Sequence, residues 1–142
     1  MTTVRVATAA DVPVVAGLRR AWTEENAGGT VEDPSFEAVF ADWFEREAGQ
    51  RVTWLAEDGD RAVGMLNMLV FTRMPRPSAA DAPAHPGRWG YVANVYVVPG
   101  DRDRGVGRLL LDAVTAEVHP FDVDFDRRQL LSGSGRLCAP GK

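Results

Sequence analysis

The sequence is poor in the residues that build disulfides and metal sites. It contains one cysteine, Cys138, and two histidines, His85 and His119, each followed by a proline in a loop-like stretch. A single cysteine excludes an internal disulfide and cannot form a thiolate zinc cluster. Histidines in such loops are usually surface residues rather than metal ligands. We therefore expect no metal site.

The sequence also lacks a long apolar run and an excess of positive charge. No apolar stretch approaches the roughly 18 residues of a membrane-spanning helix, and no signal peptide is recognisable, so we expect a cytoplasmic protein without a membrane partner. Lysine and arginine total 16 against 20 acidic residues, a net charge of −4. Because nucleic-acid binding relies on basic surface, this balance predicts no nucleic-acid partner.

What is present is the composition of one globular domain. The chain has 142 residues, 45% hydrophobic and 25% charged, enough for a single core. Its most informative stretch is 91–118, where an apolar run rich in valine meets a Pro99-Gly100 break. The charged segment 101–104 follows, and then Gly105-Val106-Gly107 leads into a leucine-rich run. This order predicts a buried strand, a tight glycine-rich turn and the start of a helix.

Such a turn is suited to binding an anion. The first backbone N–H groups of a helix have no intrahelical partners, and the helix dipole places partial positive charge there. Glycine lets a phosphate approach the backbone closely. A dinucleotide-binding fingerprint needs a small residue where Leu110 stands, and a P-loop needs Gly-Lys-Ser/Thr, which is absent. A nucleotide-binding domain using the turn for another phosphate remains an open alternative.

The spacing Arg102-x-x-Gly105-x-Gly107, directly after a strand that ends in Val97-Val98-Pro99, resembles the acyl-CoA-binding motif of the GNAT superfamily of N-acetyltransferases. The resemblance implies an enzyme that uses acetyl-CoA as cosubstrate. It would transfer the acetyl group to a primary amine of a small molecule or of a protein N-terminus. A CoA-binding domain with little or no turnover is the alternative.

The rest of the chain is similar to the GNAT order of elements over residues 3–118. The fold class expected is α/β (α+β), a mixed, mainly antiparallel central sheet flanked by helices and shortened at the C-terminus. We predict a strand at 4–7, a helix from Thr8 to Gly28-Gly29, and an amphipathic helix that starts at Asp33-Pro34 and closes at Gly49. A hairpin of strands at 51–56 and 61–71 precedes the central strand.

Three further segments complete the prediction. Residues 72–88 carry four prolines and should form a long irregular loop. Residues 121–125 alternate as one more strand, which ends the acetyltransferase domain at residue 126. The tail 127–142 should lack regular structure, whereas GNAT domains continue with a helix and a strand pair. The strand edge left exposed favours either a homodimer that covers it or a protein of marginal stability.

The resemblance assigns cofactor-binding roles to two adjacent groups of residues. The main chain of the central strand would pair with the pantetheine arm, and the turn with its arginines would hold the pyrophosphate. The residues concerned are Val95, Tyr96, Val97, Arg102, Asp103, Arg104, Gly105, Val106, Gly107 and Arg108.

The catalytic residues are less well marked. Many GNAT enzymes use a carboxylate on the central strand as a base, and this strand has none between Trp89 and Gly100. Asn94 and Tyr91 are its polar side chains of interest and are our candidates, although neither is a base at neutral pH. Glu24 and Glu25 could reach the acceptor mouth, although such glutamates more often form a solvated helix end. The tyrosine that often serves as the acid lies in the part of the GNAT domain that this chain does not reproduce.

Overall fold

The computed structural model describes residues 1–72, 74, 77 and 88–117. Along the described chain a first strand is followed by two helices, three strands and a third helix. They are β1 (Thr2–Val6), α1 (Val12–Ala27), α2 (Phe36–Glu47), β2 (Arg51–Asp58), β3 (Arg61–Thr72), β4 (Arg88–Val97) and α3 (Val106–Glu117), with short 3-10 turns at Ala9–Asp11 and Pro99–Asp101.

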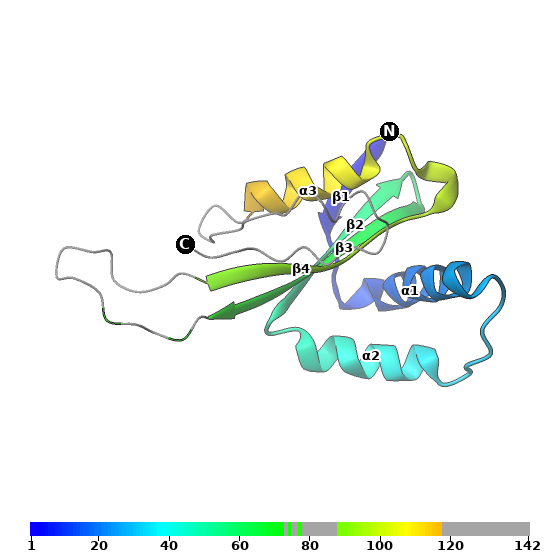
Figure 1. The fold of residues 1–142 in the computed structure, drawn as a ribbon, viewed down its shortest axis with the longest axis horizontal. Coiled ribbons are helices and arrows are strands. Elements are labelled where there is room, and N and C mark those ends of the chain that lie inside the picture. Colours follow the sequence, from blue (N-terminus) through cyan, green and yellow to red (C-terminus); the bar gives the residue numbers. More distant parts are fainter. Residues whose placement is uncertain (73, 75–76, 78–87, 118–142) are drawn as a thin grey trace.

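The strands form one four-stranded sheet in the order β1-β2-β3-β4, and each neighbouring pair is antiparallel. Helix α3 covers one face, while α1 and α2 lie on the other (Figure 1). This confirms the expected antiparallel sheet with flanking helices. Among the described residues β4 is an edge strand. The predicted strand at 121–125, the tail 127–142 and most of the predicted loop 72–88 lie outside the described residues. The end residues of that loop, Thr72 and Arg88, belong instead to β3 and β4.

Side-chain hydrogen bonds stabilise short turns ahead of the first two helices. The Thr8 backbone N–H donates to the Asp11 carboxylate at 2.7 Å, which confirms the capping interaction, but residues 9–11 form a 3-10 turn and α1 begins at Val12. The Asp33 carboxylate accepts from the Ser35 N–H at 3.1 Å. It therefore stabilises a turn ahead of α2, which begins at Phe36 rather than at Asp33-Pro34 as predicted.

Glycine has different roles at the ends of the two helices. Gly28 adopts a left-handed conformation (φ 76°) and terminates α1 as expected. Helix α2 ends at Glu47, two residues before the predicted stop at Gly49. No helix among the described residues is long and apolar enough to cross a bilayer.

The α3 face of the sheet forms a closely packed apolar core. Val106, Leu110 and Val114 recur every four residues along α3, and each is at most 3% exposed. They pack on apolar side chains of the sheet: Trp54, Ala56, Val63, Leu66, Met68, Val70 and Val92. Gly64 permits this close approach, because a Cβ there would lie 2.9 Å from the Tyr96 carbonyl oxygen and 3.3 Å from Val106.

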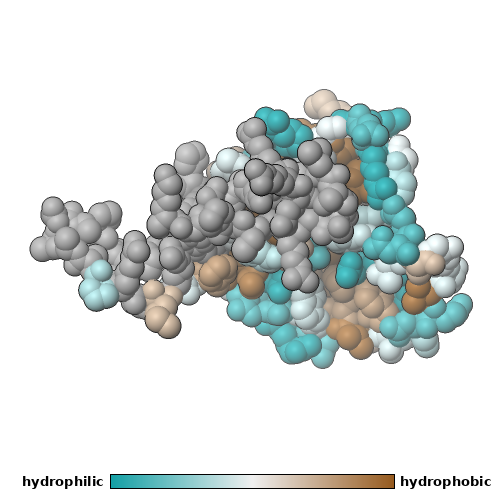
Figure 2. All heavy atoms as spheres, in the orientation of Figure 1, coloured by the Kyte–Doolittle hydropathy of each residue, from teal (hydrophilic) through white to brown (hydrophobic). Residues whose placement is uncertain are grey.

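The opposite face is covered less completely. Val15 and Leu18 of α1 pack on Leu55, Met65 and Tyr96. No residue of α2 is fully buried. The predicted apolar side of α2 instead forms a partly exposed aromatic cluster, with neighbouring ring centroids 5.4–6.5 Å apart. Figure 2 shows apolar surface over α1 and α2.

Candidate functional site

A β-bulge in β4 brings the two predicted catalytic residues to one face of the sheet. Asn94 lies opposite Asn67 and Tyr91 lies opposite Leu69, while Ala93 has no partner on β3. Since residues two apart on β3 share a face, Asn94 and Tyr91 also share one, although they are three positions apart in sequence. Both are half-buried. The face is the one that α1 and α2 cover.

A polar row crosses the sheet at the level of Asn94. Thr53 lies opposite Asn67, and Asn67 lies opposite Asn94, so the row spans β2, β3 and β4. The Asn67 amide donates to the Thr53 hydroxyl at 2.8 Å, and the Arg51 guanidinium donates to the Asn67 carbonyl at 2.8 Å. Thr53 is 4% and Asn67 6% exposed. Both buried side chains are thus hydrogen-bonded, as buried polar groups usually are.

The turn after β4 has the geometry that an anion site requires. Asp103 (φ 63°) and Gly105 (φ 80°) are left-handed, and the Leu109 N–H donates to the Gly105 carbonyl at 3.0 Å as the first bond of α3. The N–H groups of the first helical turn therefore have no intrahelical acceptor. A Cβ added at Gly107 would meet no atom within 4 Å. The space above this glycine is open to a ligand.

Comparison with known families decides the identity. The family model described as the acetyltransferase (GNAT) family matches residues 16–123. The chain belongs to the GNAT acetyltransferase family. As a member of this family, the protein is an N-acetyltransferase that uses acetyl-CoA as cosubstrate. No curated protein matches it significantly.

Solved structures agree on the GNAT fold. A predicted acetyltransferase from Clostridium acetobutylicum, solved with acetyl-CoA, is 18% identical with a TM-score of 0.56, covering 90% of this chain and 83% of that one. A ribosomal-protein-alanine N-acetyltransferase from Brucella melitensis is 14% identical with a TM-score of 0.64, covering 87% and 76%. An aminoglycoside acetyltransferase from an uncultured soil sample, in complex with sisomicin, is 15% identical with a TM-score of 0.62, covering 90% and 80%.

The arginines of the GNAT motif differ in how far their charge is already paired. The Arg102 guanidinium donates to both Glu25 carboxylate oxygens at 2.7 and 2.9 Å, and its Nε donates to the Val97 carbonyl at 2.9 Å. Arg104 lies 3.8 Å from the buried Asp101 carboxylate. Arg108 donates to the Asp112 carboxylate at 3.0 Å. The side chains of Arg104 and Arg108 are nevertheless 68% and 79% exposed, so they can turn toward an anion.

Glu25 connects α1 to the motif and is not a solvated helix end. Besides Arg102, it accepts a hydrogen bond from the Tyr96 hydroxyl at 3.1 Å. Its hydrogen bond with Arg102 lowers the pKa of Glu25, while burial, and then Glu25, raises the pKa of Tyr96. A carboxylate with a lowered pKa is a weaker base, so this arrangement disfavours Glu25 as the general base.

A second ion pair fixes the turn from the other side. Arg61, at the start of β3, donates to both oxygens of Asp101 at 2.7 and 3.1 Å. Hydrogen bonding by Arg61 lowers the pKa of Asp101. The motif is thus held between α1 and the β2–β3 hairpin. The two ion pairs hold the backbone of the turn in place from both sides.

The polar row was missed in the sequence. Asn67 stands inside an apolar run, Met65-Leu66-Asn67-Met68-Leu69. An amide within a strand expected to be buried is a signal for a satisfied polar network, and it could have directed attention to β3.

Among the described residues no group of three histidine, cysteine or acidic side chains is placed to hold a metal ion.

Proposed function

We propose that this GNAT enzyme transfers the acetyl group of acetyl-CoA to a primary amine of a small molecule or of a protein N-terminus. One observation carries the proposal. β4 leads at its C-terminal end into an anion-binding turn, and a bulge within the same strand brings Tyr91 and Asn94 to one face. The same strand, β4, would thus position both the cosubstrate and the amine.

The turn at residues 103–108 would hold the pyrophosphate. The free N–H groups at the start of α3 would donate to it, and the open space above Gly107 allows phosphate oxygens to approach the backbone. Arg104 and Arg108 would add charge from solvent-exposed positions. In this proposal Arg102 acts differently: paired with Glu25 and with the Val97 carbonyl, it positions the turn.

The main chain of Val95–Val97 would align the reactive thioester. β4 is an edge strand among the described residues, so its outward N–H and C=O groups can pair with an extended pantetheine arm. Bound acetyl-CoA supplies the activated acetyl group. A β4 N–H donating to the thioester carbonyl oxygen would stabilise the negative charge that develops there.

Asn94 and Tyr91 would position the amine. An amide and a phenolic hydroxyl can each donate and accept hydrogen bonds. We therefore propose that they hold the amine by hydrogen bonds. As the N–C bond forms and the C–S bond of the thioester breaks, CoA would leave as the thiolate and the proton of the amine would pass to water. Holding the amine close to the carbonyl is a proximity effect.

The test uses acetyl-CoA labelled in the acetyl group and a panel of small primary amines and peptides with free N-termini. Acetylated amine, identified by mass spectrometry, is expected. Asn94→Ala should lower kcat at least tenfold with unchanged CoA affinity. Asp42→Asn, an exposed change on α2, is the control. CoA binding without acetylation of any amine would contradict the proposal and favour a CoA-binding domain with little turnover.

A further inference from the structure

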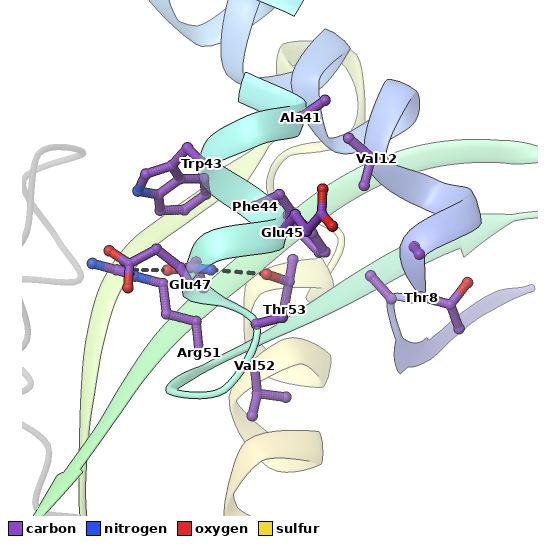
Figure 3. Close-up of a pocket in the computed structure, with 14 residues that line it drawn as sticks. Thr8, Val12, Ala41, Trp43, Phe44, Glu45, Glu47, Arg51, Val52 and Thr53 are labelled. Carbon is purple, nitrogen blue, oxygen red and sulfur yellow. Dashed lines mark hydrogen bonds and ion pairs between the residues drawn. The ribbon is translucent and has the colours of Figure 1, made fainter. Parts of the chain in front are cut away.

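A groove of about 530 Å³ lies between α2 and the sheet, within the size range of small-molecule sites. Its apolar walls come from α1 and α2 and include Val12, Trp43 and Phe44. Thr53 and Asn67 form part of its floor. Figure 3 shows Trp43 and Phe44 on α2 above Arg51 and Thr53 of β2.

The groove runs across the strands toward β4. Its lining includes Ala7 just after β1, Thr53 on β2 and Asn67 on β3. β1, β2 and β3 are neighbouring strands of the sheet. Asn94 is the next residue in this row, directly opposite Asn67. Since neighbouring strands lie about 4.8 Å apart, the groove reaches from the β1 side to within one strand of Asn94 over a span of about 10 Å.

The charges in the groove favour a cation. The Arg51 guanidinium already contacts three groups: it donates to Asn67 at 2.8 Å, its Cζ lies 5.1 Å from the Trp43 ring centroid, and its Nε is 3.7 Å from a Glu47 oxygen. Arg51 and Glu47 therefore offset each other. Glu45 also lines the groove, and among the described residues its carboxylate has no cationic partner. The lining carries one net negative charge.

We propose that this groove binds the acceptor and that the acceptor is a compound with two amino groups separated by an apolar spacer. This inference rests on the proposed function. The reacting amine lies at the Asn67 end, beside Asn94, the spacer lies along Trp43 and Phe44, and the second group, an ammonium, is attracted by Glu45.

The experiment compares hexane-1,6-diamine, hexylamine and 6-aminohexanoate, which share one amine and differ only in the charge at the far end. Binding is followed by NMR shifts of the Thr53 and Asn67 amides, and acetylation is followed separately with acetyl-CoA. We expect the diamine to bind most tightly, hexylamine less tightly and 6-aminohexanoate most weakly. Glu45→Lys should weaken diamine binding about tenfold, or 1.4 kcal/mol. It should leave hexylamine binding nearly unchanged.

Asp42→Lys is the matched control, because it makes the same charge change on α2 outside the groove lining. It should leave the order of the three compounds as in the natural sequence. Tightest binding of 6-aminohexanoate, an equal loss of diamine affinity in Asp42→Lys, or shifts that avoid Thr53 and Asn67 would overturn the inference. Diamine binding in the groove without acetyl transfer would support the groove assignment and contradict the proposed function.

Discussion

The two faces of the sheet are built for different tasks. The α3 face buries apolar side chains almost completely, with Leu110 and Val114 at 0% exposure. The α1/α2 face carries the polar row through Thr53 and Asn67, a groove and an outer helix without a fully buried residue. Close packing stabilises a fold but leaves no room for a substrate. The main apolar core and the acceptor site that we propose thus lie on opposite sides of one sheet, and substitutions can test them separately.

The largest expected effect is on the α3 face. Leu110→Ala removes a fully buried side chain and should lower the free energy of unfolding by about 2–5 kcal/mol. Val39→Ala on α2, at a position 60% exposed, should change it by less than about 0.5 kcal/mol. Urea titrations of both variants measure the contrast. Similar losses for the two would show that the faces contribute alike.

A polar-to-apolar change should affect the groove face less. Asn67→Leu removes the acceptor of Arg51 and the donor to Thr53, and unpaired buried groups cost about 1–3 kcal/mol. The same titration measures the loss, with Met68→Leu, a change of similar volume on the α3 face, as the control. A gain in stability for Asn67→Leu would mean that the row is dispensable to the fold and is retained for another reason.

The turn at the start of α3 should respond in ligand affinity rather than in packing. Gly107→Asp places a side chain and a negative charge in open space, so the fold should tolerate it. CoA affinity should fall at least tenfold, about 1.4 kcal/mol, in calorimetric titration. Gly107→Ala, without the charge, is the milder comparison. An unchanged affinity in a folded Gly107→Asp variant would refute the pyrophosphate assignment.

The smallest effect concerns the pH dependence of stability. Arg102 lowers the pKa of Glu25 below its ordinary value of 4.5, so the stabilisation is fully present above that value and is lost as pH falls through the lowered pKa. Glu25→Gln should flatten this part of the stability profile, recorded by thermal unfolding at successive pH values. Both side chains are partly exposed, so the change should be modest. Identical acid profiles would show that the pair is too solvated to matter.

Local sequence rules predicted most of the fold. Hydrophobic period, turn residues and a capping interaction identified every described helix and strand, because these signals arise within a few residues. The helix starts were misplaced by two to four residues where Asp33 and Asp11 stabilise turns instead of the first helical turn. The GNAT motif located the turn after β4 for the same reason: its glycines act locally.

The long-range features of the site could not be predicted. Glu25 and Arg102 are 77 positions apart, and the sequence around either residue does not indicate that the two form an ion pair. The row through Thr53 and Asn67 depends on strand register, which is decided by pairing across the sheet. The shared face of Tyr91 and Asn94 depends on a bulge, whereas simple alternation would have placed them on opposite faces.

The unpaired Ala93 lets β4 hold one residue more than the strand it pairs with. Deleting Ala93 would restore a regular ladder with Val92 still opposite Met68 and Tyr91 still opposite Leu69, so the side chains would keep their faces. Pairing the same strand without a bulge would instead place Ala93 opposite Met68 and turn the preceding part of β4 over. Val92 would then leave the core, and Tyr91 would enter it. One residue can therefore be lost at this point without exchanging the two faces, whereas one more residue would need a second bulge.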